Sequence, residues 1–180
     1  MEMIDREKLE AVFREHGCTD FKWLDPHSIV VAQWVRMKCM YGCWGYGDSA
    51  CPPNTPPVEE CRRFFNDYRE GVVFHFARAV EHPEDRHDWG RETTARLLAL
   101  ERAVFLSGYH KAFMLPADTC SLCPECAPTR VDCRHQKLAR PTAEGLGVDV
   151  FATVRQYDYP IDVLFDETQE MNRYAFLLVE

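Results

Sequence analysis

The sequence contains a run of cysteines whose spacing suits iron–sulfur chemistry. Two residues separate Cys120 from Cys123 and Cys123 from Cys126, and Cys133 follows after six more. A cubane cluster needs several thiolates that approach different irons of one small body, and two-residue spacers let one loop present three of them in succession. A structural zinc ion usually takes its four ligands as two well-separated pairs. We therefore expect a 4Fe–4S cluster, with zinc as the alternative cofactor and a metal-free loop as the weakest interpretation.

A second group of thiols has the pattern Cys39-x3-Cys43-x7-Cys51 and lies in a glycine- and proline-rich loop over residues 39–55. Glycines let the backbone approach a cluster and direct N–H groups at its sulfurs. In two-cluster ferredoxins the last cysteine of one motif often binds the other cluster, so Cys133 can belong to either site. The sequence thus predicts one or two 4Fe–4S clusters, with these metal ligands: Cys39, Cys43, Cys51, Cys120, Cys123, Cys126 and Cys133.

Other residues near these loops allow two interpretations each. Cys61 is a possible ligand, but it lies on an expected helix beside Phe64, where a small buried thiol is ordinary core material. Cys18 stands alone, and we expect it to be structural. His135 is a possible neighbour of the cluster or an alternative ligand, although a solvated loop position is the simpler expectation.

Three aromatic residues surround the first cysteine loop: Trp34, Trp44 and Tyr46. They can form a wall that shields a cluster or stacks on a ligand, or they can anchor the loop in the core. We favour the second interpretation because large aromatic side chains bury much apolar area.

Positive charge gathers around both loops of a chain whose formal net charge is −8. Arg36 and Lys38 precede Cys39, and the segment 129–140 has four basic residues (Arg130, Arg134, Lys137 and Arg140) against Asp132. Basic neighbours favour the thiolate form of cysteine and offset the negative charge of a cluster. The charge pattern therefore supports a loaded metal site.

Composition excludes several classes of protein. With 46% hydrophobic and 28% charged residues in 180 positions, the chain has the make-up of a soluble globular domain. No apolar run is long enough to cross a membrane, the acidic balance argues against nucleic-acid partners, and the N-terminus lacks the apolar core of a secretory signal. A cytoplasmic location follows as the expectation, where nine cysteines would bind metal more readily than form disulfides.

Periodicity predicts alternating helices and strands. Helices are expected over 5–16, 55–68 and 91–110, with the last one well buried; a helical turn over 141–146; and strands over 28–37, 72–80, 111–115, 148–154 and 174–179. The expected fold is a single layered α/β or α+β domain, residues 1–180, with two long cysteine-bearing loops at one end. Residues 1–35 are its least diagnostic part.

The cysteine motifs occur in a distinctive order with several others. These are Tyr46-Gly47, Cys51-Pro52-Pro53, the segment 108–113, Cys133-Arg134, Arg140-Pro141 and the segment 147–151. From about Arg36 to the C-terminus the chain resembles the predicted metal-binding proteins of domain of unknown function 2284. The resemblance implies a cysteine-bound metal centre, of iron–sulfur type, and it implies no particular reaction. The segment 142–144 departs from the expected serine–methionine pair without touching a proposed ligand.

Two functional hypotheses follow. The first is a redox protein that transfers electrons to or from a partner protein, or that acts on a small, sulfur-containing substrate at an iron that lacks a protein thiolate. The second is a zinc-stabilised interaction module or a metal-handling chaperone without catalysis. The close spacing of Cys120, Cys123 and Cys126 favours the first hypothesis.

Overall fold

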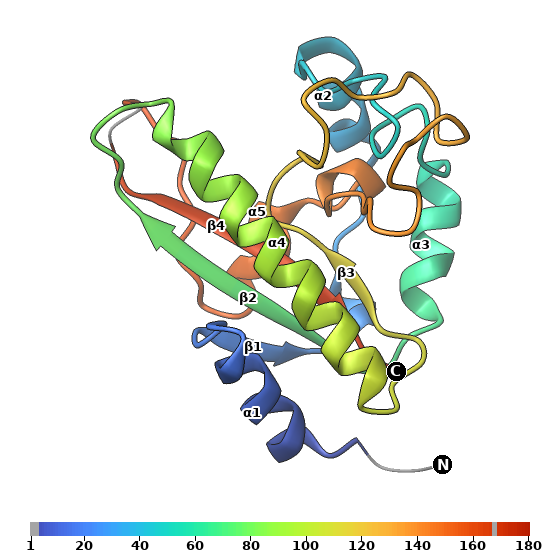
Figure 1. Ribbon diagram of the computed structural model, residues 1–180, viewed down its shortest axis with the longest axis vertical. Coiled ribbons are helices and arrows are strands. Elements are labelled where there is room, and N and C mark those ends of the chain that lie inside the picture. Colours follow the sequence, from blue (N-terminus) through green and yellow to red (C-terminus); the bar gives the residue numbers. More distant parts are fainter. Residues whose placement is uncertain (1–3, 167–168) are drawn as a thin grey trace.

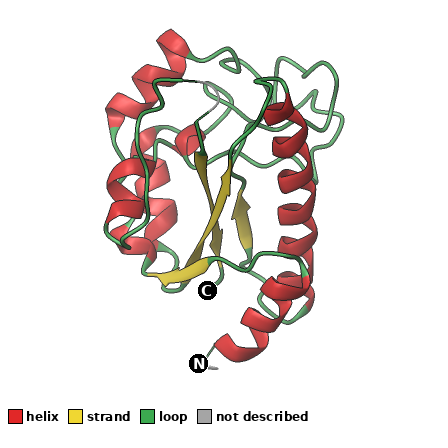
Figure 2. Ribbon diagram, turned by 90° about the vertical axis from the view of Figure 1, so that its left-hand side faces the viewer, coloured by secondary structure: helices red, strands yellow, loops and turns green. Residues whose placement is uncertain are grey.

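The structure is a computed structural model, and it describes residues 4–166 and 169–180. Its centre is a four-stranded antiparallel sheet with the strand order β1-β2-β4-β3. The strands are β1 (Phe21–Leu24), β2 (Gly71–Arg78), β3 (Phe113–Leu115) and β4 (Met171–Leu178). Helices lie on both sides of the strands (Figure 2). The expected mixed α and β domain is confirmed, and its sheet is antiparallel.

One face of the sheet is covered by α1 (Arg6–Glu15) and α4 (Asp85–Leu106), as Figure 1 shows. The Asp5 carboxylate caps α1 by accepting a hydrogen bond from the Lys8 N–H. The core of this face is formed by side chains from both helices and from the sheet, including Leu9, Phe13, Leu97, Leu100, Val104, Val72, Phe74 and Leu177. Apolar residues at helical spacing are thus buried against alternating strand residues.

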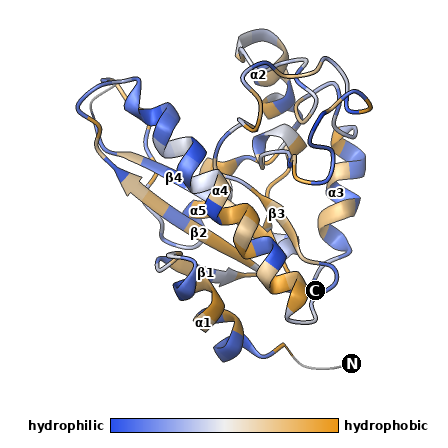
Figure 3. Ribbon diagram, in the orientation of Figure 1, coloured by the Kyte–Doolittle hydropathy of each residue, from blue (hydrophilic) through white to orange (hydrophobic). Residues whose placement is uncertain are grey.

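The opposite face packs against α3 (Val58–Asn66), α5 (Val150–Arg155) and the 3-10 turns η1 (Pro26–Ser28) and η2 (Glu144–Leu146). Strands β2 and β4 present Val73 and Phe176 to this side, one residue out of phase with the side chains on the first face. Both strands are therefore buried on two sides, which explains their nearly continuous apolar sequences. Figure 3 shows this hydrophobic centre.

Two predicted strands are wrong. Residues 28–37 run from the end of η1 through a short extended link into α2 (Gln33–Gly42). The link pairs only at Val31, which forms a single bridge to Val148, so no strand forms. Residues 148–154 include the Val148 bridge, the N-cap Asp149 and most of α5, and the Asp149 carboxylate caps the helix by accepting a hydrogen bond from the Ala152 N–H. In both segments a run of β-branched residues suggested a strand, but the local hydrogen bonds favour helix.

Other differences concern the extent of elements. Strand β1 was not predicted, and α4 begins six residues before its expected start. The end of α4 is also less buried than its apolar sequence suggested, since Phe105 is 52% exposed and Leu106 is 68% exposed. The expected strands 72–80, 111–115 and 174–179 and the helices 5–16 and 55–68 are confirmed to within a few residues.

The two cysteine-bearing loops meet at one end of the sheet. They lie beside α2 and next to the start of α3 (Figure 1). The second loop leaves the sheet after β3 and is held at its beginning by an ion pair between Asp118 Oδ2 and Arg173 Nη1, 2.6 Å apart. Within the described ranges, no helix is long and apolar enough to cross a membrane.

The Asp118–Arg173 pair requires a glycine in α4. A Cβ atom at Gly90 would lie 2.3 Å from Asp118 Oδ2 and 3.2 Å from Arg173 Nη1. Alanine normally stabilises a helix interior by up to about 1 kcal/mol relative to glycine. At this position we expect Gly90→Ala to lower the free energy of unfolding instead, by about 1–3 kcal/mol, because the ion pair must move. Urea unfolding measures the effect.

A double-mutant cycle with Asp118→Ala checks the steric cause. In the Asp118→Ala background, Gly90→Ala should cost much less than it does in the wild type. An equal cost in both backgrounds would show that another contact is responsible.

Candidate metal centre

The first cysteine group (Cys39, Cys43 and Cys51) is positioned by α2 and the turns that follow it. Cys39 lies in the last turn of α2, and Cys43 is its C-cap, with an N–H that donates to the Cys39 carbonyl. The two residues are four positions apart and therefore share one face of the helix end. The predicted loop 39–55 thus begins four residues too early, since Cys39 belongs to a helix.

Successive turns bring Cys51 back to the end of α2. The Cys51 N–H donates to the Asp48 carbonyl over 2.8 Å, and the Gly47 N–H donates to the Pro52 carbonyl over 2.7 Å. Gly47 has a φ angle of +99°, which a side chain would strain. All three thiols of the first group line a cavity of about 220 Å³, which we call the first cavity. This volume equals the share of about seven water molecules in liquid water.

The second cysteine group (Cys120, Cys123, Cys126 and Cys133) lies in the adjacent loop. Cys120, Cys123 and Cys126 line a neighbouring cavity of about 650 Å³, together with Trp44 of the first loop. Cys133 packs beside Cys120, in a small cluster with Ala50 and Ala139. Cys133 therefore contacts residues of both loops, Ala50 of the first and Cys120 of the second, and which cluster it would bind stays open.

Two polar residues of the first loop hold the second loop in place. The backbone N–H of Ser49 donates to Cys126 Sγ over 3.4 Å, and the Ser49 hydroxyl lies at the same distance from that sulfur. The Asn54 side-chain amide donates to the carbonyls of Gly47, Asp48 and Pro128, at 3.0, 3.2 and 3.1 Å. The two cysteine groups are therefore parts of one interlocked structure.

The pKa values of several thiols are shifted because the two loops pack closely around them. Burial is the main cause that raises the pKa of Cys51 to about 12, and the nearby Asp48 carboxylate and the other thiolates of the region contribute to the same shift. Burial also raises the pKa of Cys39 and of Cys120. The pKa of Cys133 is lowered, first by the Ser49 hydroxyl and also by the guanidinium of Arg130. Because thiols must lose their protons to bind metal, loading the raised sites must release protons.

Cys61 and Cys18 lie away from both groups. Cys61 is 1% exposed, belongs to the core between α3 and the sheet, and donates a hydrogen bond to the Pro56 carbonyl over 3.4 Å. Burial raises its pKa. Cys18 is also 1% exposed and is part of the core on the opposite face. Neither thiol lines the cavities that the seven other cysteines surround.

The aromatic residues near the first loop are not anchored in the core as we predicted. Trp34 is 52% exposed and Trp44 is 78% exposed. Both line a groove of about 890 Å³ that also includes Cys39, Cys43 and Glu144. Tyr46 lines the first cavity. Since Cys39, Cys43 and Glu144 belong to both spaces, the groove leads to the first cavity.

Glu144 is a residue of the site that the sequence analysis missed. It lies at the start of η2, and its backbone carbonyl accepts a weak hydrogen bond from the Cys39 thiol over 3.9 Å. Glu144 is an exposed residue where it lines the cavities. The protein around its carboxyl group nevertheless excludes much of the water, and this desolvation raises the pKa of the group. Ser49 and Asn54 were missed as well, because a single serine or asparagine in a loop carries no distinguishing pattern.

The arrangement gathers seven thiols at one end of a layered α+β domain. A family profile described as "predicted metal-binding protein (DUF2284)" matches residues 22–179, so the chain belongs to this family. The match begins before Arg36, the start that the motifs indicated, and it includes all of β1 except Phe21 and all of α2. No curated protein and no solved structure matches the chain. Among the described residues, no three His, Cys, Asp or Glu side chains converge closely enough for a single metal ion.

The Asn54 amide offers a direct test of the interlocked loops. Asn54→Ala removes the hydrogen bonds to Gly47, Asp48 and Pro128. We expect amide hydrogens in residues 118–140 to exchange up to about tenfold faster, because the loss of hydrogen bonds to exposed or partly buried carbonyls costs about 0.5–1.5 kcal/mol. The matched control is Asn66→Ala, at an exposed position of α3. Unchanged exchange in Asn54→Ala would mean that other contacts hold the loop.

Proposed function

We propose that the protein is an iron–sulfur redox protein with two 4Fe–4S clusters, one at each cysteine group. The observation that carries the proposal is the gathering of seven thiols around adjoining cavities, with the three of the first group lining a single cavity. Thiolates are the preferred protein ligands of iron–sulfur clusters. Each thiolate of a cluster binds a different iron, so such ligands stand farther apart than those of one zinc ion, whose sulfurs are about 3.8 Å apart.

The residues around the thiols fit an anionic cluster. Arg130 lies beside Cys133, and its buried Nη1 atom has no hydrogen-bond partner among the described residues. The Ser49 N–H and hydroxyl point at Cys126, as donors to a cluster thiolate should. Gly45 leaves room in the first cavity, since a Cβ atom there would stand 3.7 Å from Cys51 Sγ. A cluster would therefore find both space and positive charge.

The first group supports a substrate role. It has three thiols, so a cluster bound there would keep one iron without a protein thiolate, available as a Lewis acid to a donor atom of a small molecule. The groove leads to this cavity, and its walls include Trp34, Trp44 and Phe151. Such walls would hold an apolar molecule with its sulfur-containing end toward Cys39 and Cys43.

Electron transfer to a partner protein is the second candidate function. It is favoured by an exposed apolar face at the end of α2, where Met37, Met40, Tyr41 and Trp44 follow helical spacing. This face adjoins the first cysteine group, so a partner bound there would lie close to a cluster. We propose the cytoplasm as the location, since all nine cysteines are free and a reducing compartment keeps them so.

The deciding measurement is iron, zinc and acid-labile sulfide in protein purified without oxygen. We expect about eight irons and eight sulfides per chain, the content of two cubanes. One or two zinc ions without sulfide would instead establish the alternative, a zinc-stabilised interaction module or a metal-handling chaperone.

Single cysteine variants test the ligand assignment. Cys123→Ala should lower bound iron by about half, because one cluster loses a ligand. Cys61→Ala and Cys18→Ala are matched controls from the two core faces and should retain the wild-type iron content. Unchanged iron in Cys123→Ala would contradict the ligand assignment, and loss of one cluster in Cys61→Ala would make Cys61 a ligand.

Removal of the metal should loosen the loops and leave the sheet intact. The second cysteine loop has little regular structure of its own, so we expect metal binding to supply much of its order. In hydrogen exchange, amides of residues 43–55 and 118–140 should lose protection after anaerobic chelation, while β2 and β4 keep theirs. Protection of these loops that does not depend on metal would contradict a structural role for the clusters.

A further inference from the structure

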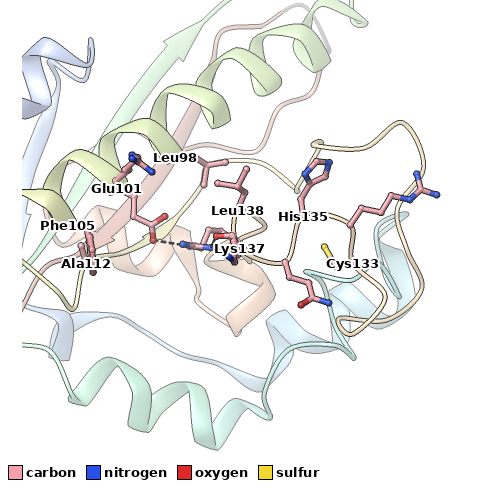
Figure 4. Close-up of a pocket in the computed structure, with 12 residues that line it drawn as sticks. Leu98, Glu101, Phe105, Ala112, Cys133, His135, Lys137 and Leu138 are labelled. Atoms are coloured by element: carbon pink, nitrogen blue, oxygen red, sulfur yellow. Dashed lines mark hydrogen bonds and ion pairs between the residues drawn. The ribbon is translucent and has the colours of Figure 1, made fainter.

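A further hollow is lined in part by Cys133 and shares no lining residue with the first cavity. It has a volume of about 680 Å³ and is enclosed by the C-terminal half of α4 and the segment 133–140. Figure 4 shows Leu98 and Glu101 projecting from α4 toward the loop that carries Lys137 and Leu138, with Phe105 beside Ala112. The hollow has the size of a small-molecule site.

Part of the hollow is apolar. Leu98, Phe105, Ala112 and Leu138 line it. Phe105 is 52% exposed and Leu138 is 51% exposed. Apolar side chains that remain open inside a concave space offer area to the body of a ligand.

The rest of the lining is cationic. The lining contains one carboxylate, that of Glu101, and four cationic side chains: Arg102, Arg134, Lys137 and Arg140. Glu101 is already neutralised, because its Oε1 accepts hydrogen bonds from Arg140 Nε at 2.8 Å and from the Met114 N–H at 3.0 Å. Within residues 4–166 and 169–180, no hydrogen bond or ion pair engages the side chains of Arg102, Arg134 or Lys137. Three uncompensated cations therefore surround one hollow in a chain of net charge −8.

The cluster does not account for these cations. The guanidinium that acts on the Cys133 thiol is that of Arg130, whose other contact is the Gln136 carbonyl. Arg102 comes from α4 and is not part of either cysteine loop. The basic residues of segment 129–140 thus divide into Arg130 at the thiols, Arg140 at Glu101, and Arg134 and Lys137 at the hollow.

We propose that this hollow binds a phosphate monoester with an apolar body. Arg102, Arg134 and Lys137 would hold the phosphate, whose double negative charge suits several cations better than a single carboxylate does. Leu98, Phe105 and Leu138 would contact the apolar part. The site is independent of the substrate groove, because the two spaces share no residue.

The test is calorimetric titration of anaerobically purified, metal-loaded protein with three probes. 1-Naphthyl phosphate carries both features of the proposed ligand, inorganic phosphate carries the charge alone, and 1-naphthol carries the apolar body alone. We expect naphthyl phosphate to bind at least about tenfold more tightly than either of the others. Its affinity should fall as sodium chloride is added, because screening weakens the contacts with the cations.

Variants separate the two parts of the site. Arg134→Gln with Lys137→Gln should weaken naphthyl phosphate binding by about tenfold or more. The matched control, Lys8→Gln with Arg63→Gln, removes two exposed cations from α1 and α3 and changes the net charge equally. Phe105→Ser should abolish the preference for naphthyl phosphate over inorganic phosphate and leave phosphate binding itself unchanged.

Several outcomes would overturn the proposal. These are equal affinity for naphthyl phosphate and inorganic phosphate, an equal loss in the control pair, and no binding of naphthyl phosphate at millimolar concentration. Iron and sulfide are measured on each variant. If the loop variant loses iron, Phe105→Ser decides the question, because Phe105 lies on α4 outside both cysteine loops. Iron content and probe binding are separate readouts, so this proposal and the iron–sulfur function can fail independently.

Discussion

The buried carboxylate of Glu101 fixes the second cysteine loop to the sheet. It projects from α4 and accepts hydrogen bonds from the Met114 N–H at the edge strand β3 and from Arg140 at the end of the loop. A carboxylate that is 6% exposed must be paired, because an unpaired buried charge is costly. Asp118 and Arg173 make a similar connection at the loop's start. Both ends of the cysteine segment are therefore tied to the folded layers by ion pairs, and the thiols between them are held near the first group.

The sequence allowed the thiols and most of the sheet to be predicted, because both signals are local. Two-residue spacers between cysteines and continuous apolar runs such as residues 174–179 need no knowledge of distant contacts. Residues 28–37 and 148–154 show the limit. Both contain β-branched residues, yet they become helices because the chain pairs only briefly, at Val31 and Val148, before each helix begins. That choice depends on tertiary contacts that no local pattern records.

The same limit applies to the site. The basic residues of segment 129–140 were interpreted together as neighbours of the cluster, whereas the structure gives them three different environments. Arg130 faces a thiol, Arg140 pairs with a carboxylate from another element, and Lys137 lines a hollow. Their charge was visible in the sequence, but their partners lie up to 39 positions away, as for Arg140 and Glu101. Ser49 and Asn54 became recognisable as site residues only through their contacts with the second loop.

The strand order has a consequence for how the protein is made. β4 lies between β2 and β3, although among the described strands it comes after both in the sequence. During synthesis from the N-terminus, all nine cysteines leave the ribosome before the strand that joins the two halves of the sheet. Arg173, which anchors the start of the second cysteine loop, arrives with that strand. The Asp118–Arg173 pair can thus form only after β4 has been made, and until then the second cysteine loop lacks the ion pair that holds its start.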